Sequence, residues 1–167
     1  MHSLVEQLRG FGARHPVPAD APFLAALYAS TRGDLLGDGS ADPVFAAQLI
    51  AMQQRLQTRD YAARFPTAEV VLLEHAGLPF ARLVVHTNAA RIRLVDIALL
   101  PAARGRGLGG RILQALQQWA RRRALPLSLA VHPGNHGARR LYAGLGFLAI
   151  DGDGVDGAAC ELVWHPF

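Results

Sequence analysis

Four glycines fall within residues 105–110 (GRGLGG), between Arg104 and Arg111. An apolar run precedes this stretch, and an amphipathic, helix-like run follows it. Glycine permits positive φ and leaves no Cβ in the way, so successive backbone N–H groups can point into one concavity. The positive end of a following helix favours anions there, and arginine adds charge and forked donors. The stretch therefore predicts a site for phosphate or pyrophosphate. The alternative is a tight strand-to-helix turn that binds no ligand.

Two common phosphate-binding motifs do not fit this stretch. The chain contains no lysine, which excludes a Walker A loop. Gly105, Gly107 and Gly110 match the dinucleotide fingerprint G-x-G-x-x-G, but that fingerprint needs an acidic residue about twenty positions on to hold a ribose. Residues 125–133 (LPLSLAVHP) contain no carboxylate. A dinucleotide-binding domain is therefore not favoured.

The elements that must position this turn follow from periodicity and from glycine and proline breaks. Asp20 is an expected N-cap, and Phe45, Leu49, Met52 and Leu56 form a helical apolar stripe. We expect one α/β domain over residues 1–167, with a mixed, mostly antiparallel sheet of about seven strands and about four helices. Helices are expected from residue 20 and over residues 42–64, 107–123 and 135–143. Strands are expected near residue 13 and over residues 69–75, 79–87, 91–100, 127–131, 147–151 and 159–164.

Composition favours a globular protein in a reducing compartment. A chain of 167 residues suits one domain. No apolar run reaches the roughly 18 residues of a membrane span, and the first residues lack the apolar core of a signal peptide. Cys160 is the single cysteine, so no internal disulfide can form. We expect a cytoplasmic protein with no membrane partner.

Two motifs resemble those of the GNAT superfamily of acyl-CoA N-acyltransferases. Residues 104–109 (RGRGLG) resemble its [Gln/Arg]-x-x-Gly-x-[Gly/Ala] motif, and residues 135–147 (NHGARRLYAGLGF) resemble its second signature, N-x-x-A-x-x-L-Y-x-x-x-G-F. The expected order of strands and helices is also similar. The resemblance covers nearly the whole chain, is specific over residues 96–147, and is loose before residue 68.

This resemblance implies acetyl-CoA as the co-substrate, with no metal. The glycine turn would cradle its pyrophosphate, and the preceding strand would run alongside its pantetheine arm. A backbone N–H near Ile97 would polarise the thioester carbonyl. Asn135 would contact the cofactor, and it can also serve as the N-cap of the following helix. The residues expected to bind the cofactor are Ile97, Ala98, Leu99, Arg104, Gly105, Arg106, Gly107, Leu108, Gly109, Gly110, Asn135 and Tyr142.

The resemblance also places a general acid at Tyr142, because many family members use the tyrosine at this position to protonate the departing thiolate. A phenol with a pKa near 10 stays protonated at neutral pH, whereas a thiol has a pKa near 8.5, so the phenol can donate. The competing interpretation is that Tyr142 only packs against the cofactor sulfur.

A base is needed as well, because an amine with a lysine-like pKa is mostly protonated at neutral pH. Some family members keep a glutamate for this on the strand after the glycine-turn helix, and the matching residue here is Ala130. Asp96 is the best remaining carboxylate, with a hydrogen-bonded structural role as the alternative. Glu74, His86 and His132 are further candidates.

Other groups that could carry chemistry are not favoured. His132 and His136 lack a nearby carboxylate or cysteine, so a metal site is not expected. The acidic loop at residues 151–157 does not match a calcium-binding loop; it is a solvated hairpin loop or attracts a cationic amine. Cys160 lies away from both motifs, so a covalent cysteine relay is not expected.

The combined prediction is an N-acetyltransferase that transfers the acetyl group of acetyl-CoA directly to a primary amine in a ternary complex. A small-molecule amine and a peptide amine both remain open, as do a longer acyl group and a homodimer. One alternative is a nucleic-acid or regulatory binding module built on the six arginines within residues 104–123. These arginines could also line a solvated helix face. Another alternative is a GNAT-like domain that binds acyl-CoA without catalysis.

Overall fold

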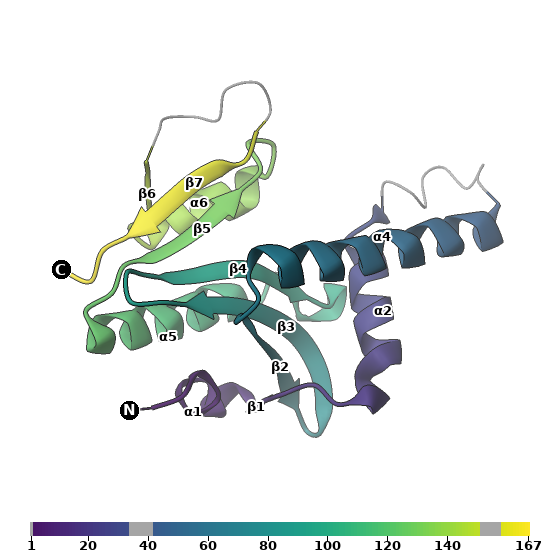
Figure 1. The fold of residues 1–167 in the computed structure, drawn as a ribbon, viewed down its shortest axis with the longest axis horizontal. Coiled ribbons are helices and arrows are strands. Elements are labelled where there is room, and N and C mark those ends of the chain that lie inside the picture. Colours follow the sequence, from purple (N-terminus) through teal and green to yellow (C-terminus); the bar gives the residue numbers. More distant parts are fainter. Residues whose placement is uncertain (1, 34–41, 151–157) are drawn as a thin grey trace.

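One mixed sheet organises the chain (Figure 1). The computed structural model describes residues 2–33, 42–150 and 158–167. The strand order is β1-β2-β3-β4-β5-β7-β6, and β4 and β5 are the parallel pair among otherwise antiparallel neighbours. The expected mixed, mostly antiparallel sheet is therefore confirmed. The strands are β1 (Ala13–Arg14), β2 (Glu69–His75), β3 (Leu78–Thr87), β4 (Ile92–Leu99), β5 (Leu127–Val131), β6 (Leu148–Ala149) and β7 (Cys160–Trp164).

Helices cover both faces of this sheet. The core against α5 contains Leu83 and Val85 of β3, and Ile92 and Leu94 of β4. Val84, which lies between Leu83 and Val85, is also buried but does not belong to that core, and the same is true of the buried residues of α2 and α4. Since side chains alternate across a strand, α2 and α4 cover the opposite face from α5. The α-helices of the described residues are α1 (Leu4–Gln7), α2 (Ala21–Ser30), α4 (Pro43–Arg64), α5 (Leu108–Arg123) and α6 (His136–Gly144). Short 3-10 turns lie at η1 (Arg9–Phe11), η2 (Pro18–Asp20) and η3 (Pro101–Ala103).

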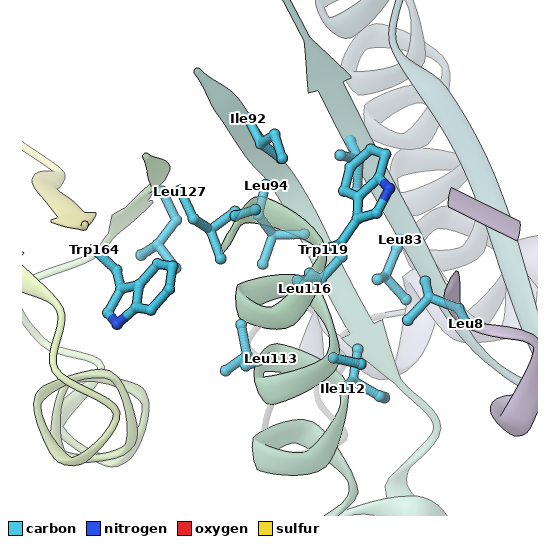
Figure 2. Close-up of a cluster of buried hydrophobic side chains, with 14 of the residues drawn as sticks. Leu8, Leu83, Ile92, Leu94, Ile112, Leu113, Leu116, Trp119, Leu127 and Trp164 are labelled. Atoms are coloured by element: carbon cyan, nitrogen blue, oxygen red, sulfur yellow. The ribbon is translucent and has the colours of Figure 1, made fainter. Parts of the chain in front are cut away.

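Helix α5 supplies the centre of the larger core. Ile112, Leu113, Leu116 and Trp119 follow the helical repeat and pack beneath the sheet, near Leu94 (Figure 2). The helix ends at Ala124, which adopts positive φ and donates its N–H to the Ala120 carbonyl, and a proline follows two residues later. This C-terminal arrangement ends the helix where the sequence predicts it. The glycine turn therefore lies at one end of α5, within the strand–helix–strand unit formed by β4, α5 and β5.

Three local expectations differ from the structure. Helix α1 was not expected, although Ser3 and Glu6 form a capping box there. Asp20 does not cap α2 with its side chain; its carboxylate instead accepts hydrogen bonds from Arg14 and from the backbone N–H of Val17. The bidentate guanidinium is the stronger partner for a carboxylate.

The apolar stripe expected on α4 does not face the core. Phe45, Met52 and Leu56 are 62%, 44% and 55% exposed, whereas Ala46 and Ile50 are buried. The N-terminal part of α4 extends beyond the sheet, beside α2 (Figure 1). The helical period is therefore correct, but the buried face is a different one.

Candidate active site

Strands β4 and β5 separate partway along their length. Their parallel pairing covers Ile92 to Leu94 on β4 and stops at the pair Leu94–Leu129. Beyond that point β5 continues to Val131, paired with β7. Within the described residues, the β5-facing edge of β4 from Val95 to Leu99 has no strand partner. Its backbone donors and acceptors can therefore pair with an extended ligand that lies along this edge as an added strand.

A β-bulge in β4 begins at the same place. Val84 of β3 pairs with Asp96, and Val85 pairs with Leu94, so Val95 is an extra residue on β4. In a regular strand without the bulge, Asp96 would lie two residues after Leu94 and point to the same face as Leu94, into the core against α5. The extra residue turns the side chain of Asp96 to the face covered by α2 and α4.

On that face Asp96 borders a cavity of about 300 Å³. Arg82 of β3 donates from Nη2 to the Asp96 carboxylate, and the same nitrogen lies 3.5 Å from Oε1 of Gln57 on α4. The side chains of Arg82 and Asp96 are 12% and 25% exposed. The cavity is lined by Leu27, Tyr28, Thr31, Gln57, Arg82, Asp96, Ile97, Ala98, Leu99 and Arg104.

The glycine turn connects β4 to α5 and adopts the backbone conformation that glycine permits. Gly105 and Gly107 have φ of 73° and 74°, in the left-handed region. The first backbone hydrogen bond of α5 runs from the Arg111 N–H to the Gly107 carbonyl, at 3.1 Å. The N–H groups of the three residues before Arg111 therefore have no acceptor within the helix. They can donate to an anion at the positive end of the helix.

A second cavity, of about 320 Å³, lies at this turn. Helix α6 borders this cavity through Leu141, and a Cβ at Gly110 would lie 3.4 Å from Cδ1 of Leu141. The cavity is lined by Leu99, Ala103, Arg104, Gly105, Gly107, Leu108, Gly109, Gly110 and Leu141. Leu99 and Arg104 also line the cavity beside Asp96, so the two cavities share a wall.

The arginines of the turn point in different directions. Arg104 donates from Nε to the Leu99 carbonyl at 2.9 Å and from Nη2 to the Ser30 hydroxyl at 3.2 Å. Arg106 is exposed and, with Phe11 and Phe80, lines a third cavity of about 640 Å³. Arg104 thus lines the cavity at the glycine turn and also bonds to β4 and α2.

Tyr142 lies in α6 and is 8% exposed. Its ring packs edge-on against Phe147, with centroids 5.7 Å apart. Among the described residues its hydroxyl has no hydrogen-bond partner. Burial raises the pKa of Tyr142, and the negative charge of Asp96 raises it further. Both effects favour the protonated phenol.

Tyr61 of α4 is a nearby group that the sequence analysis did not identify. Burial raises the pKa of Tyr61 to about 12, and the charge of Asp96 adds to this effect. Arg82 and Gln57 were also missed. These three residues lie on β3 and α4, far from both motifs in sequence, and no local pattern identifies them.

Asn135 occupies the N-cap position of α6. Its Oδ1 accepts a hydrogen bond from the Ala138 N–H at 3.2 Å, which confirms the capping role. The alternative bases lie elsewhere: Glu74 forms an ion pair with Arg14 at 2.8 Å, and the His86 ring lies 5.5 Å from that of Phe65. Neither residue lines the cavity beside Asp96.

His132 accepts a hydrogen bond from the backbone N–H of Gly134 at Nδ1, 3.0 Å away. It shapes the turn before α6 and does not line the cavity beside Asp96.

In the part of the chain that the structure describes, no three His, Cys, Asp or Glu side chains gather as metal ligands would. The acidic loop at residues 151–157 lies outside this part. No helix within the described ranges is long and apolar enough to cross a membrane.

The arginine run at the end of α5 makes three separate contacts. Arg123 stacks over the ring of Trp119 at 4.3 Å, and Arg121 over the ring of Trp164 at 5.4 Å. Arg122 donates to the side chain of Gln7. Positive charge in the last turn of a helix is also favoured by the helix dipole. These arginines therefore have roles in packing.

Comparison with known proteins identifies a matching family. The profile of the acetyltransferase (GNAT) family matches residues 48–147. No curated protein sequence matches the chain. The structure of PaiA N-acetyltransferase from Thermoplasma acidophilum in complex with coenzyme A is similar, with a TM-score of 0.64 at 14% identity over 92% of this chain and 97% of that one.

The ribosomal-protein-S18-alanine N-acetyltransferase from Escherichia coli is similar as well. Its TM-score is 0.56 at 19% identity, over 90% of this chain and 89% of that one. At such identities the likeness establishes the fold. The expected arrangement of strands and helices is thereby supported by solved structures.

Proposed function

Because the chain belongs to the GNAT family of acetyltransferases, we propose that it transfers the acetyl group of acetyl-CoA directly to a primary amine in a ternary complex. The observation that carries this proposal is the unpaired edge of β4 from Val95 to Leu99, which leads into the glycine turn. An extended arm and a terminal pyrophosphate would be bound by these two features in succession. The residues present therefore fit coenzyme A.

Binding of the cofactor would use mainly backbone groups. The N–H groups of Leu108, Gly109 and Gly110 would hold the pyrophosphate, aided by the dipole of α5 and the positive φ of Gly105 and Gly107. The backbone of Ile97, Ala98 and Leu99 would hold the pantetheine arm. Arg104 and Arg106 would contribute positive charge, and Asn135 retains its amide nitrogen for the cofactor while its oxygen caps α6.

When bound, acetyl-CoA supplies a thioester: the amine nitrogen bonds to its carbonyl carbon, the carbon–sulfur bond breaks, and the departing sulfur takes up a proton. The backbone N–H near Ile97 would polarise the carbonyl. Tyr142 would donate the proton to the sulfur. Its raised pKa keeps the hydroxyl protonated, and its lack of a protein partner leaves the hydroxyl available.

Asp96 would receive the proton that the amine loses, directly or through a water molecule. Its carboxylate already accepts a hydrogen bond from Arg82, which fixes its orientation. It is the carboxylate that lines the cavity next to Ile97. This position supports Asp96 over Glu74, His86 and His132.

Calorimetric titration with acetyl-CoA tests the binding half of the proposal. Wild type is expected to bind, and the double variant Arg106→Glu, Gly107→Asp is expected to lose binding. Its matched control is Arg55→Glu, Gly144→Asp, which makes the same change in charge at an exposed residue of α4 and at the end of α6. Absence of binding by folded wild type, or equal loss in the control, would contradict the proposal.

Turnover with a panel of primary amines tests the catalytic half. Release of coenzyme A thiol is followed for wild type and for Tyr142→Phe. Acetylation of at least one amine separates an enzyme from a domain that binds acyl-CoA without catalysis. A polynucleotide titration over a salt series tests the nucleic-acid alternative, which predicts tight, salt-sensitive binding.

A further inference from the structure

The cavity beside Asp96 contains charges of both signs close together. Arg82 and Asp96 are in direct contact, and both side chains are largely buried. The lining described above holds one further charged group, Arg104, and no second carboxylate. Among the described lining residues, two guanidinium groups therefore face one carboxylate. An acceptor with only positive charge is disfavoured in such a site, whereas one that also carries an anionic group is favoured.

Arg82 has hydrogen-bond donors that the protein does not use. Its Nη2 serves both Asp96 and Gln57, whereas Nε is buried without a partner. Among the described residues, Nη1 has no partner either. Because Nε is buried, the donors that remain for a ligand carboxylate are the two N–H groups of Nη1. Arg104 differs, because its Nε and Nη2 already bond to Leu99 and Ser30.

The cavity is also small and partly apolar. Its volume of about 300 Å³ includes the space beside Ile97, Ala98 and Leu99, where the arm of the cofactor would lie. The remaining space suits a molecule of few heavy atoms. Leu27 and Tyr28 of α2 supply apolar parts of its wall.

We propose that the acceptor is a small amino acid-like molecule with a free carboxylate close to its amino group and an apolar side chain. Arg82 binds the carboxylate, and the adjacent Asp96 receives the amine; Arg82 is thus a specificity-determining residue. This inference rests on the proposed function and specifies the chemical class of its acceptor. The first carboxyl group of a protein N-terminus is locked in a peptide bond, so the same geometry disfavours protein N-termini.

Direct binding measured by calorimetry at saturating coenzyme A tests this inference without relying on turnover. The probes are L-leucine, L-methionine and L-phenylalanine, each compared with its C-terminal amide, which has a neutral carboxamide in place of the carboxylate and a more acidic ammonium group. We expect the acid to bind about ten-fold or more tightly than the amide, as for other charge-assisted hydrogen bonds. Arg82→Gln should abolish this preference, and Arg55→Gln on the exposed side of α4 should retain it.

Removing Arg82 alone leaves the largely buried carboxylate of Asp96 without its ion-pair partner, which can impair folding. The double variant Arg82→Gln, Asp96→Asn removes both charges and is used for the same binding measurement. A preference for the acid that persists in either folded variant overturns the inference. Equal binding of acid and amide by wild type also overturns it.

Acetylation of the same pairs separates this inference from the proposed function. The amide loses its ammonium proton more readily than the amino acid, so intrinsic reactivity favours the amide. A higher kcat/KM for the acid would therefore reflect recognition and support the inference. Transfer to the amides alone would overturn the inference and leave the proposed function intact. A binding preference for the acids with no transfer to any amine would support the site and contradict the transferase.

Discussion

Replacing Gly107 with alanine tests whether backbone conformation alone builds the glycine turn. Gly107 has φ of 74°, and a Cβ added there would meet no heavy atom within 4 Å. Because space is available, the cost is that of holding an L-residue in the left-handed region, about 1–2 kcal/mol. Gly144 in α6 is the matched control, because its φ lies outside that region and its Cβ would also meet nothing within 4 Å. Alanine there should be neutral or stabilise the fold by up to about 1 kcal/mol.

The backbone strain in Gly107→Ala can lower either the stability of the free protein or its affinity for coenzyme A. If the turn keeps its shape without ligand, the free energy of unfolding of the free protein falls by about 1–2 kcal/mol and the affinity for coenzyme A is unchanged. If the free turn relaxes, stability is kept, and the dissociation constant rises about 5–30-fold because binding must restore the strained backbone. The free energy of unfolding at saturating coenzyme A includes both the stability of the free protein and the free energy of coenzyme A binding. It should therefore fall by about 1–2 kcal/mol in either case.

The assay is urea unfolding of wild type, Gly107→Ala and Gly144→Ala, with and without excess coenzyme A. Circular dichroism and the fluorescence of the buried Trp119 and Trp164 report the transition. Calorimetry gives the dissociation constant independently. Equal unfolding free energies for Gly107→Ala and wild type at saturating coenzyme A would refute the reasoning, and so would an equal loss in Gly144→Ala.

Three further predictions concern single side chains. Tyr142→Phe should lower kcat by about 10²–10⁴-fold with little change in the KM for acetyl-CoA. In wild type, burial and the charge of Asp96 raise the pKa of Tyr142, so the alkaline loss of activity in a steady-state pH profile should come at a higher pH than the ionisation of a free phenol. Full activity in Tyr142→Phe would exclude the acid role. Arg14 lowers the pKa of Asp20 to about 2, so the stabilisation by this carboxylate is present above its unfolded pKa of about 3.9 and is lost as the pH falls through about 2. Acid unfolding followed by circular dichroism should therefore show a component between these values in wild type that Asp20→Asn lacks, and identical profiles would contradict it. Cys160→Ala should leave kcat unchanged because transfer is direct, whereas loss of turnover in the folded variant would indicate a covalent acyl-enzyme.

Much of the fold could be predicted from local pattern. The strands over residues 69–75 and 127–131 have the predicted bounds, because short apolar runs between turn residues specify extended backbone. The ends of α5 follow from Gly107 and from the proline after Ala124 in the same way. The apolar stripe on α4 shows the limit of this approach. Periodicity predicts that a helix forms, but the packing of α2 and α4 decides which of its faces is buried.

In the candidate site, too, some features follow from local sequence and others from tertiary packing. Local sequence specifies the glycine turn, its place between a strand and a helix, and the cap at Asn135, since each depends on residues within one or two turns of chain. Only the tertiary structure decided that Asp96 leaves the core against α5, because the extra residue Val95 belongs to the register between β3 and β4. It also decided that Arg82 bonds to Asp96 and that Gln57 lies beside Arg82. Register and interhelical packing join residues far apart in the chain, and their free energies depend on contacts that no local pattern encodes.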